Sequence, residues 1–421
     1  MTMDFKRNLV LVASLIGFLL LIFGIDYIRT SGLFSRSTQA PANEAVIQKY
    51  AAEVMEVCGK DSYPPRCYDI EIPKLMDRGV SIEDSFKVTS VIQTKTNGYF
   101  FCHVLGHNLA AKETAKDPSK WTEVIGKCPT GMCSNGCLHG AAQERFRSEV
   151  LTPAQQKDTL PELAKICQPG SGRSFTGLEQ ASCYHALGHL AMYITGADIK
   201  ASTNICNVIA KVGQQDYTQT CYEGAYMQIF QPLEPEDFTL VKDIAPQSTE
   251  AAEKYCRTFS GEYNAACHRE SWPLYRESLT TSKGLQYFCS LVPDKVSSQR
   301  CYNAMFYVLT AQLNFEVERI TPLCEALPEK QKAQCFANAA SRSVETDYRL
   351  SGRAVELCKV AENHGVGERC YNELLFYSSF NYHEGSPEFK AMCNALPEPW
   401  KTKCLNGEGK TVHPTQGSDS E

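Results

Sequence analysis

A chain of 421 residues with 43% hydrophobic residues can bury a large core, and its net charge of −6 excludes the basic footprint of a nucleic-acid-binding protein. Its 20 cysteines are too many for idle thiols in a reducing compartment. An even number at regular spacing indicates disulfides and an oxidising location.

The chain begins with a short basic segment followed by a long apolar one. Residues 9–25 are apolar apart from Ser14, and Lys6 and Arg7 precede them. A helix of this length, at about 1.5 Å per residue, nearly crosses the hydrocarbon core of a bilayer. We predict a signal anchor with a cytoplasmic N-terminus, and an ectodomain in the periplasm or at the cell surface. A cleaved signal peptide is the alternative, although its apolar region is usually shorter and no clean A-x-A site follows.

A cysteine that begins a helix recurs along the chain. From Cys267 the intervals between these cysteines are 34, 34, 35 and 34 residues, and such a period indicates a repeat protein. In each unit an amphipathic helix ends near one cysteine, a polar turn follows, and a second cysteine begins an aromatic-rich helix. We predict an all-α fold, a right-handed TPR-type α-solenoid of about ten disulfide-stapled helix hairpins with a period of about 34 residues.

Changes in composition divide the chain into six segments. We predict a cytoplasmic tip with a transmembrane helix (1–29), a linker (30–43), N-terminal repeats (44–230), an insertion rich in proline (231–248), C-terminal repeats (249–405) and a disordered tail (406–421).

The layout of each repeat predicts how the cysteines pair. The end of one helix and the start of the next lie close across a short turn, and each bridge there is worth about 3 kcal/mol in the chain-entropy model. The predicted bridges are Cys58–Cys67, Cys167–Cys183, Cys206–Cys221, Cys256–Cys267, Cys289–Cys301, Cys324–Cys335, Cys358–Cys370 and Cys393–Cys404.

Four cysteines lie outside this simple scheme. Cys128 and Cys137 occupy the equivalent positions of the third unit, whereas Cys102 is displaced by one residue. We predict that Cys102 pairs with the additional Cys133 and joins units two and three. The alternative is a metal site formed by Cys128, Cys133, Cys137 and His139. Its spacing fits neither a zinc ribbon nor a c-type haem motif.

The segments CYNAMFYVL (301–309) and CYNELLFYS (370–378) resemble those of secreted Sel1-like repeat proteins, in which a disulfide closes each helix pair. The glycine-rich turns of Sel1 repeats are absent from this chain. The resemblance implies a solenoid and says nothing about an activity.

Units two to four carry histidines at equivalent helix positions, and unit five has Glu223 at the first of these positions. In units two and four the histidines form pairs four residues apart, which lie on one helix face. If neighbouring repeats bring these faces together, the imidazoles suit Zn, Cu or Fe and do not suit Ca or Mg. The predicted metal ligands are His103, His107, His139, His185, His189, Glu223 and Glu144.

Glycine supplies a separate indication in the same helices. Gly106, Gly140, Gly188 and Gly224 lie inside them, and each costs a helix about 1 kcal/mol relative to alanine. Close helix approach or room for a ligand would account for them.

Three functions fit these patterns. The chain is a metal-dependent enzyme such as an oxidoreductase or hydrolase, a metal-binding protein without turnover, or a scaffold whose solenoid face binds a peptide or an envelope protein. In the scaffold the histidines would be structural. No HExxH, G-x-S-x-G, P-loop or G-x-G-x-x-G motif identifies a substrate.

Overall fold

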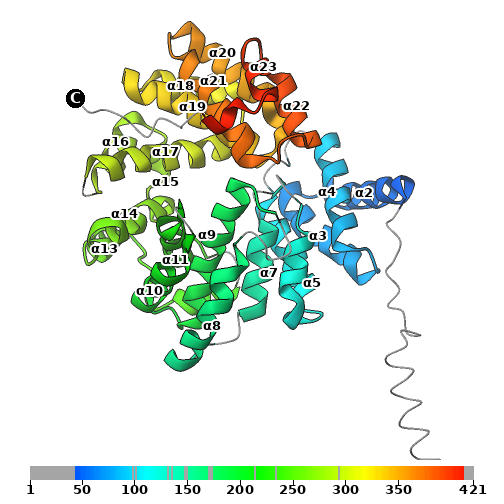
Figure 1. The fold of residues 1–421 in the computed structure, drawn as a ribbon, viewed down its shortest axis with the longest axis vertical. Coiled ribbons are helices and arrows are strands. Elements are labelled where there is room, and N and C mark those ends of the chain that lie inside the picture. The colour runs from blue at the N-terminus through cyan, green and yellow to red at the C-terminus, as the bar shows by residue number, and fades with distance from the viewer. Residues whose placement is uncertain are drawn as a thin grey trace, which may run out of the picture. The chain divides into compact units, whose positions relative to one another are not determined.

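The repeating pattern of the sequence folds into a succession of helix pairs, seen here in a computed structural model (Figure 1). The structure describes residues 43–96, 99, 102–129, 132–133, 136–146, 150–168, 174–212, 215–232, 235–292 and 294–411. The predicted transmembrane helix lies outside these residues. None of the helices within them has the length and apolar character needed to cross a bilayer.

Ten helix pairs follow one another in the part of the chain that the structure describes. They are α2 (Glu44–Cys58) with α3 (Pro64–Asp77), α4 (Ile82–Lys95) with α5 (His103–Thr114), α6 (Trp121–Lys127) with α7 (Gly136–Phe146), α8 (Pro153–Ile166) with α9 (Gly177–Ile194), α10 (Ile199–Ile209) with α11 (Thr218–Phe230), α13 (Thr249–Cys256) with α14 (Gly261–Glu270), α16 (Ser282–Ser290) with α17 (Lys295–Gln312), α18 (Val317–Glu325) with α19 (Glu329–Thr346), α20 (Ser351–Asn363) with α21 (Gly367–Asn381), and α22 (Pro387–Ala395) with α23 (Trp400–Leu405).

Shorter elements connect these pairs. They are β1 (Lys211–Val212) and β2 (Gln215–Asp216), which pair antiparallel, α12 (Pro235–Val241), α15 (Arg276–Leu279), and the 3₁₀ turns η1 (Pro118–Lys120), η3 (Trp272–Tyr275), η4 (Tyr348–Leu350) and η5 (Glu408–Thr411). The predicted all-α class is confirmed. The short antiparallel pair of β1 and β2 is an addition to it. Helix α12 lies in the predicted insertion. Turn η5 lies within the segment 406–421 predicted to be disordered, and its Gly409 packs closely on the backbone oxygen of Leu375. Residues 412–421 of that segment lie outside the described residues.

Disulfides close the helix pairs as the cysteine spacing predicts. Nine of the bridges join the two helices of one pair, with Cα atoms 5.3–5.6 Å apart. The tenth, Cys102–Cys133, joins two successive pairs with its Cα atoms 4.5 Å apart. These ten bridges use all 20 cysteines of the sequence, so no thiol is left. The alternative metal site on Cys128, Cys133 and Cys137 is therefore wrong, because their sulfurs are oxidised.

The aromatic-rich second helix of each pair builds the core between successive pairs. Phe306 of α17, Phe336 of α19 and Tyr371 of α21 are each at most 1% exposed. Burying a side chain of this size contributes about 1.5–3 kcal/mol. Repeats therefore stabilise one another through these helices, as expected of a repeat protein.

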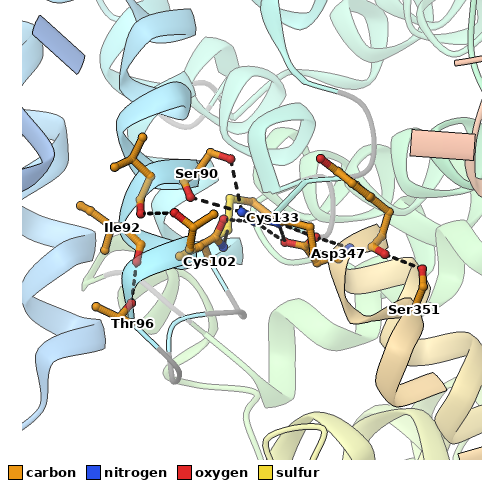
Figure 2. Close-up of polar contacts among 12 residues, drawn as sticks. Ser90, Ile92, Thr96, Cys102, Cys133, Asp347 and Ser351 are labelled. Atoms are coloured by element: carbon orange, nitrogen blue, oxygen red, sulfur yellow. Dashed lines mark hydrogen bonds and ion pairs between the residues drawn. A yellow bond between two sulfur atoms is a disulfide. The ribbon is translucent and has the colours of Figure 1, made fainter. Parts of the chain in front are cut away.

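The last repeats also contact the first ones. Arg349 of η4 donates from Nη2 to Oε1 of Gln93 at 2.5 Å and from Nη1 to the backbone oxygen of Ser90 at 3.2 Å. Asp347 orients the same guanidinium by accepting from its Nε at 2.8 Å, and Figure 2 shows these contacts around Ser90 and Asp347. The charge of Arg349 is thus matched and held against α4.

Candidate metal centre

Four neighbouring helices, α5, α7, α9 and α11, carry the predicted site. A capping box begins α9: Thr176 Oγ1 accepts from the backbone N–H of Glu179 at 3.2 Å, and the Glu179 carboxylate accepts from the backbone N–H of Thr176 at 2.9 Å. Such a box satisfies two N–H groups that a helix start otherwise leaves unpaired. The helix that carries His185 and His189 is thereby fixed at its first turn.

Glycine brings these helices unusually close together. A Cβ added at Gly140 of α7 would lie 2.2 Å from the backbone oxygen of His107 on α5. In the next two helices, a Cβ at Gly188 would lie 2.0 Å from the oxygen of Cys221, and one at Gly224 would lie 2.0 Å from that of His185. Only a residue without a side chain fits at such distances. The glycines therefore serve close helix approach, one of the two explanations that the sequence offers.

The close approach gathers three histidines at the start of α5 and α7. His103 and His107 come from α5 and His139 from α7, and one ring nitrogen of each lies within 4.8 Å of the others. His107 and His139 are buried, and His103 is half-buried. The spacing of four residues on one helix and the packing of the next helix thus produce a three-imidazole group.

A second group lies directly beside the first. His189 Nε2 is 3.2 Å from His185 Nε2, and His185 Nε2 is 3.3 Å from the sulfur of Met227 on α11. The ring of His139 stands between the groups, with its centroid 5.4 Å from that of His185 and 4.9 Å from that of His103. The structure therefore brings all five predicted histidines into one cluster.

Burial keeps these imidazoles neutral. It lowers the pKa of His107, His139 and His185 well below the usual value, and the neighbouring histidines lower it further. Burial also lowers the pKa of His189, against the opposing effects of Gln228 and Asp237. A neutral imidazole has a lone pair for a metal ion. Among the described residues, the buried Nε2 of His139 has no hydrogen-bond partner, which is rare for such an atom and leaves it available as a ligand.

A cavity of about 10 Å³, the room of a single water molecule, adjoins the cluster. The carboxylate of Asp237 on α12 lines it, and this residue is only 3% exposed. Gln143 Nε2 donates to Asp237 Oδ1 at 3.0 Å, and the hydroxyl of Tyr193 donates to the same oxygen. The lining residues are His103, His107, His139, Gln143, His189, Met227, Gln228, Gln231 and Asp237.

The two predicted carboxylate ligands lie elsewhere. Glu223 forms an ion pair with Arg269 of α14, whose side chain is only 4% exposed. Glu144 is half-buried and does not line the cavity. The carboxylate beside the cluster is instead that of Asp237, which lies in the predicted insertion. The repeat pattern does not extend to this segment, so it could not predict the residue.

Other residues of the site carry weak signals in the sequence. Tyr193 follows His189 by four residues and therefore shares its helix face. Gln228 accepts from His189 Nδ1 at 2.7 Å and follows Met227 directly. No signal in the sequence indicates Asp237.

Comparison with family models, with curated proteins and with solved structures finds no match. The resemblance to Sel1-like repeats therefore stays a prediction.

Proposed function

We propose that this protein is a membrane-anchored, extracytoplasmic helical-repeat protein that binds a transition-metal ion through His103, His107 and His139. The observation that carries the proposal is the convergence of three imidazole ligand atoms within 4.8 Å of one another. Its repeats stack as a right-handed α-solenoid, and residues 9–25 anchor it.

The donor set decides the class of metal. Three neutral imidazoles suit Zn, Cu or Fe, whereas Ca and Mg prefer carboxylate and carbonyl oxygens. Ligand nitrogens at about 2.0–2.1 Å from one tetrahedral ion lie about 3.3 Å apart, so small side-chain rotations would complete the site. The unpaired Nε2 of His139 supports this reading, because a bound ion would satisfy it.

The adjoining cavity favours catalysis over a purely structural metal. Structural zinc sites have four protein ligands, whereas catalytic sites have three and keep one position for water or substrate. Three histidines beside a cavity with room for one water fit the second description. Asp237, held by Gln143 and Tyr193, lies where it would orient or accept a proton from a molecule in that cavity.

The proposed location rests on two features. Ten disulfides are typical of proteins in an oxidising compartment, and residues 9–25 have the length of a signal anchor. A reporter fused after Glu421 is expected to be active only outside the cytoplasm, with the protein in the membrane fraction. Release of a soluble chain shortened by about 30–40 residues would instead indicate a cleaved signal peptide.

Elemental analysis tests the metal site. The full chain, purified from membranes under oxidising conditions and dialysed, should retain close to one equivalent of Zn, Cu or Fe. The double variant His103→Gln/His107→Gln should lose it and keep its circular-dichroism spectrum. Its control is His364→Gln, which changes a histidine outside the cluster. Wild-type protein that stays metal-free after reconstitution would contradict the proposal and favour a scaffold with structural histidines.

A further inference from the structure

Two other donor atoms of the second group lie close to His185 Nε2. His185 Nε2 lies 3.2 Å from His189 Nε2 and 3.3 Å from Met227 Sδ. These separations match those between ligands of a single ion, since two nitrogens at about 2.0–2.1 Å from a tetrahedral ion lie about 3.3 Å apart. The atoms belong to two helices, α9 and α11, whose close packing at Gly188 and Gly224 sets their spacing.

The available hydrogens cannot satisfy these three atoms. In the orientation that the Gln228 amide has in the structure, its Oε1 accepts from His189 Nδ1 at 2.7 Å, so this nitrogen carries the hydrogen of the neutral ring. His189 Nε2 therefore presents a lone pair, and so does the thioether sulfur of Met227. His185 Nε2 carries one hydrogen at most and can direct it to only one of these neighbours. In this half-buried group at least one lone pair is therefore left over, whichever nitrogen of His185 carries its hydrogen.

We propose that His185, His189 and Met227 form a second metal site, adjacent to the first, that binds monovalent copper. A cation at their centre would accept all three lone pairs at once. Thioether sulfur is a soft ligand that selects Cu(I) among the biological metals, and imidazole also binds copper. The hydrogen bond from His189 to Gln228 fixes the ring orientation and tautomer, as such bonds do in metal sites. This inference deepens the proposed metal-binding function but rests on other residues, so an experiment can refute either site without refuting the other.

Silver(I) is the probe for this site, because it has the charge and softness of Cu(I) and needs no reductant that would open the disulfides. All 20 cysteines are oxidised, so no thiolate competes for it. The full chain is first loaded with Zn²⁺ to fill the first site, then titrated with Ag⁺ in chloride-free buffer. Bound Zn and Ag are measured by elemental analysis, and the affinity for Ag⁺ by calorimetry.

Wild-type protein should bind one Ag⁺ without losing Zn²⁺. The variant Met227→Leu, which keeps the size of the side chain, should bind Ag⁺ at least about tenfold more weakly, since even indirect partners of a metal cost 10–100-fold. Its matched control is Met392→Leu, in a methionine of α22 outside the cluster. In wild-type protein with ¹³C-labelled methionine methyl groups, Ag⁺ should shift the Met227 signal selectively.

Three results separate the proposals. Zinc-loaded protein that takes up no Ag⁺, or binds it equally well as Met227→Leu, overturns the second site and leaves the first intact. An Ag⁺ signal that reaches other methionine methyls and leaves Met227 unchanged overturns it as well. Protein that binds none of Zn²⁺, Cu²⁺ and Fe²⁺ but binds Ag⁺ through Met227 supports the second site and overturns the first.

Discussion

The imidazole of His139 on α7 stacks on that of His185 on α9, with ring centroids 5.4 Å apart and planes at 20°. This contact joins the two glycine-packed helix pairs, α5 with α7 and α9 with α11. Helices α5 and α7 contribute the first group of metal-binding side chains, and helices α9 and α11 contribute the second. His139 lies where the two groups meet. A change at this ring should therefore affect both groups.

Replacement of His139 by glutamine is expected to weaken zinc binding by at least about 100-fold. Loss of residues that only orient metal ligands costs 10–100-fold, and a direct ligand should cost no less. Competition with a chromophoric chelator measures the change, and His364→Gln is the control. Unchanged zinc affinity in a folded His139→Gln protein would remove this residue from the ligand set.

The buried His268 and the half-buried Glu270 of α14 should give opposite pH dependences. Burial lowers the pKa of His268 to about 4, whereas burial and the nearby Glu223 raise the pKa of Glu270 to about 8. Below about pH 6.5 the unfolded chain binds a proton at His268 that the folded chain does not. The free energy of unfolding therefore decreases as the pH falls from 6.5 to 4. Above about pH 4.5 the unfolded chain releases a proton that folded Glu270 retains, so stability is lost as the pH rises toward 8.

Urea unfolding of the corresponding variants isolates each effect. Relative to wild type, His268→Gln should gain stability as the pH falls from 6.5 to 4, by at most about 1.4 kcal/mol per pH unit. Glu270→Gln should gain stability relative to wild type as the pH rises from 4.5 to 8. Parallel curves for wild type and variant would contradict the corresponding assignment.

The substitution Gly188→Ala should destabilise the protein by about 1–3 kcal/mol and reduce metal retention, because its Cβ would overlap the backbone oxygen of Cys221. Gly352→Ala is the matched control, since it is also helical and a Cβ there meets nothing within 4 Å. Removing that glycine should instead stabilise by about 0.4–1 kcal/mol. Thermal unfolding and elemental analysis compare the two, and equal effects would refute the role of close packing.

The disulfide Cys102–Cys133 lies next to His103, whereas Cys393–Cys404 lies in the last repeat. Replacing both cysteines by serine should cost about 4 kcal/mol for the first bridge and about 3 kcal/mol for the second in the chain-entropy model. Only the first pair of substitutions is expected to weaken zinc binding, because it releases the start of the helix that carries two ligands. Equal zinc affinities in the two variants would show that this bridge does not position His103.

The cysteine pairing was predictable because repetition turns sequence position into spatial position. Once a period is known, Cys289 and Cys301 must lie across one turn, and the displaced Cys102 must seek a partner in the next unit. The same logic brings His103, His139 and His185 together, since equivalent residues of stacked repeats face the same way.

The residues that could not be predicted are those whose positions or partners the repeat period does not determine. Asp237 lies in an insertion with no counterpart in other repeats, so comparing the repeats could not predict that it lies beside the histidines. Glu223 has the right helix position, but a helix face says nothing about its partner, and Arg269 of the next repeat pairs with it. The contact of Arg349 with Gln93 joins residues too distant in sequence for any local pattern to relate.

That last contact changes how the molecule should come apart. In a linear array each repeat is held only by its neighbours, so the terminal repeats are the first to open. Here the guanidinium of Arg349 ties a late hairpin to α4, near the other end of the array. Fraying at one end then requires giving up contacts at the other. Amide hydrogens of α4 and of α20 should consequently exchange together, in one opening event that spans chain segments more than 250 residues apart.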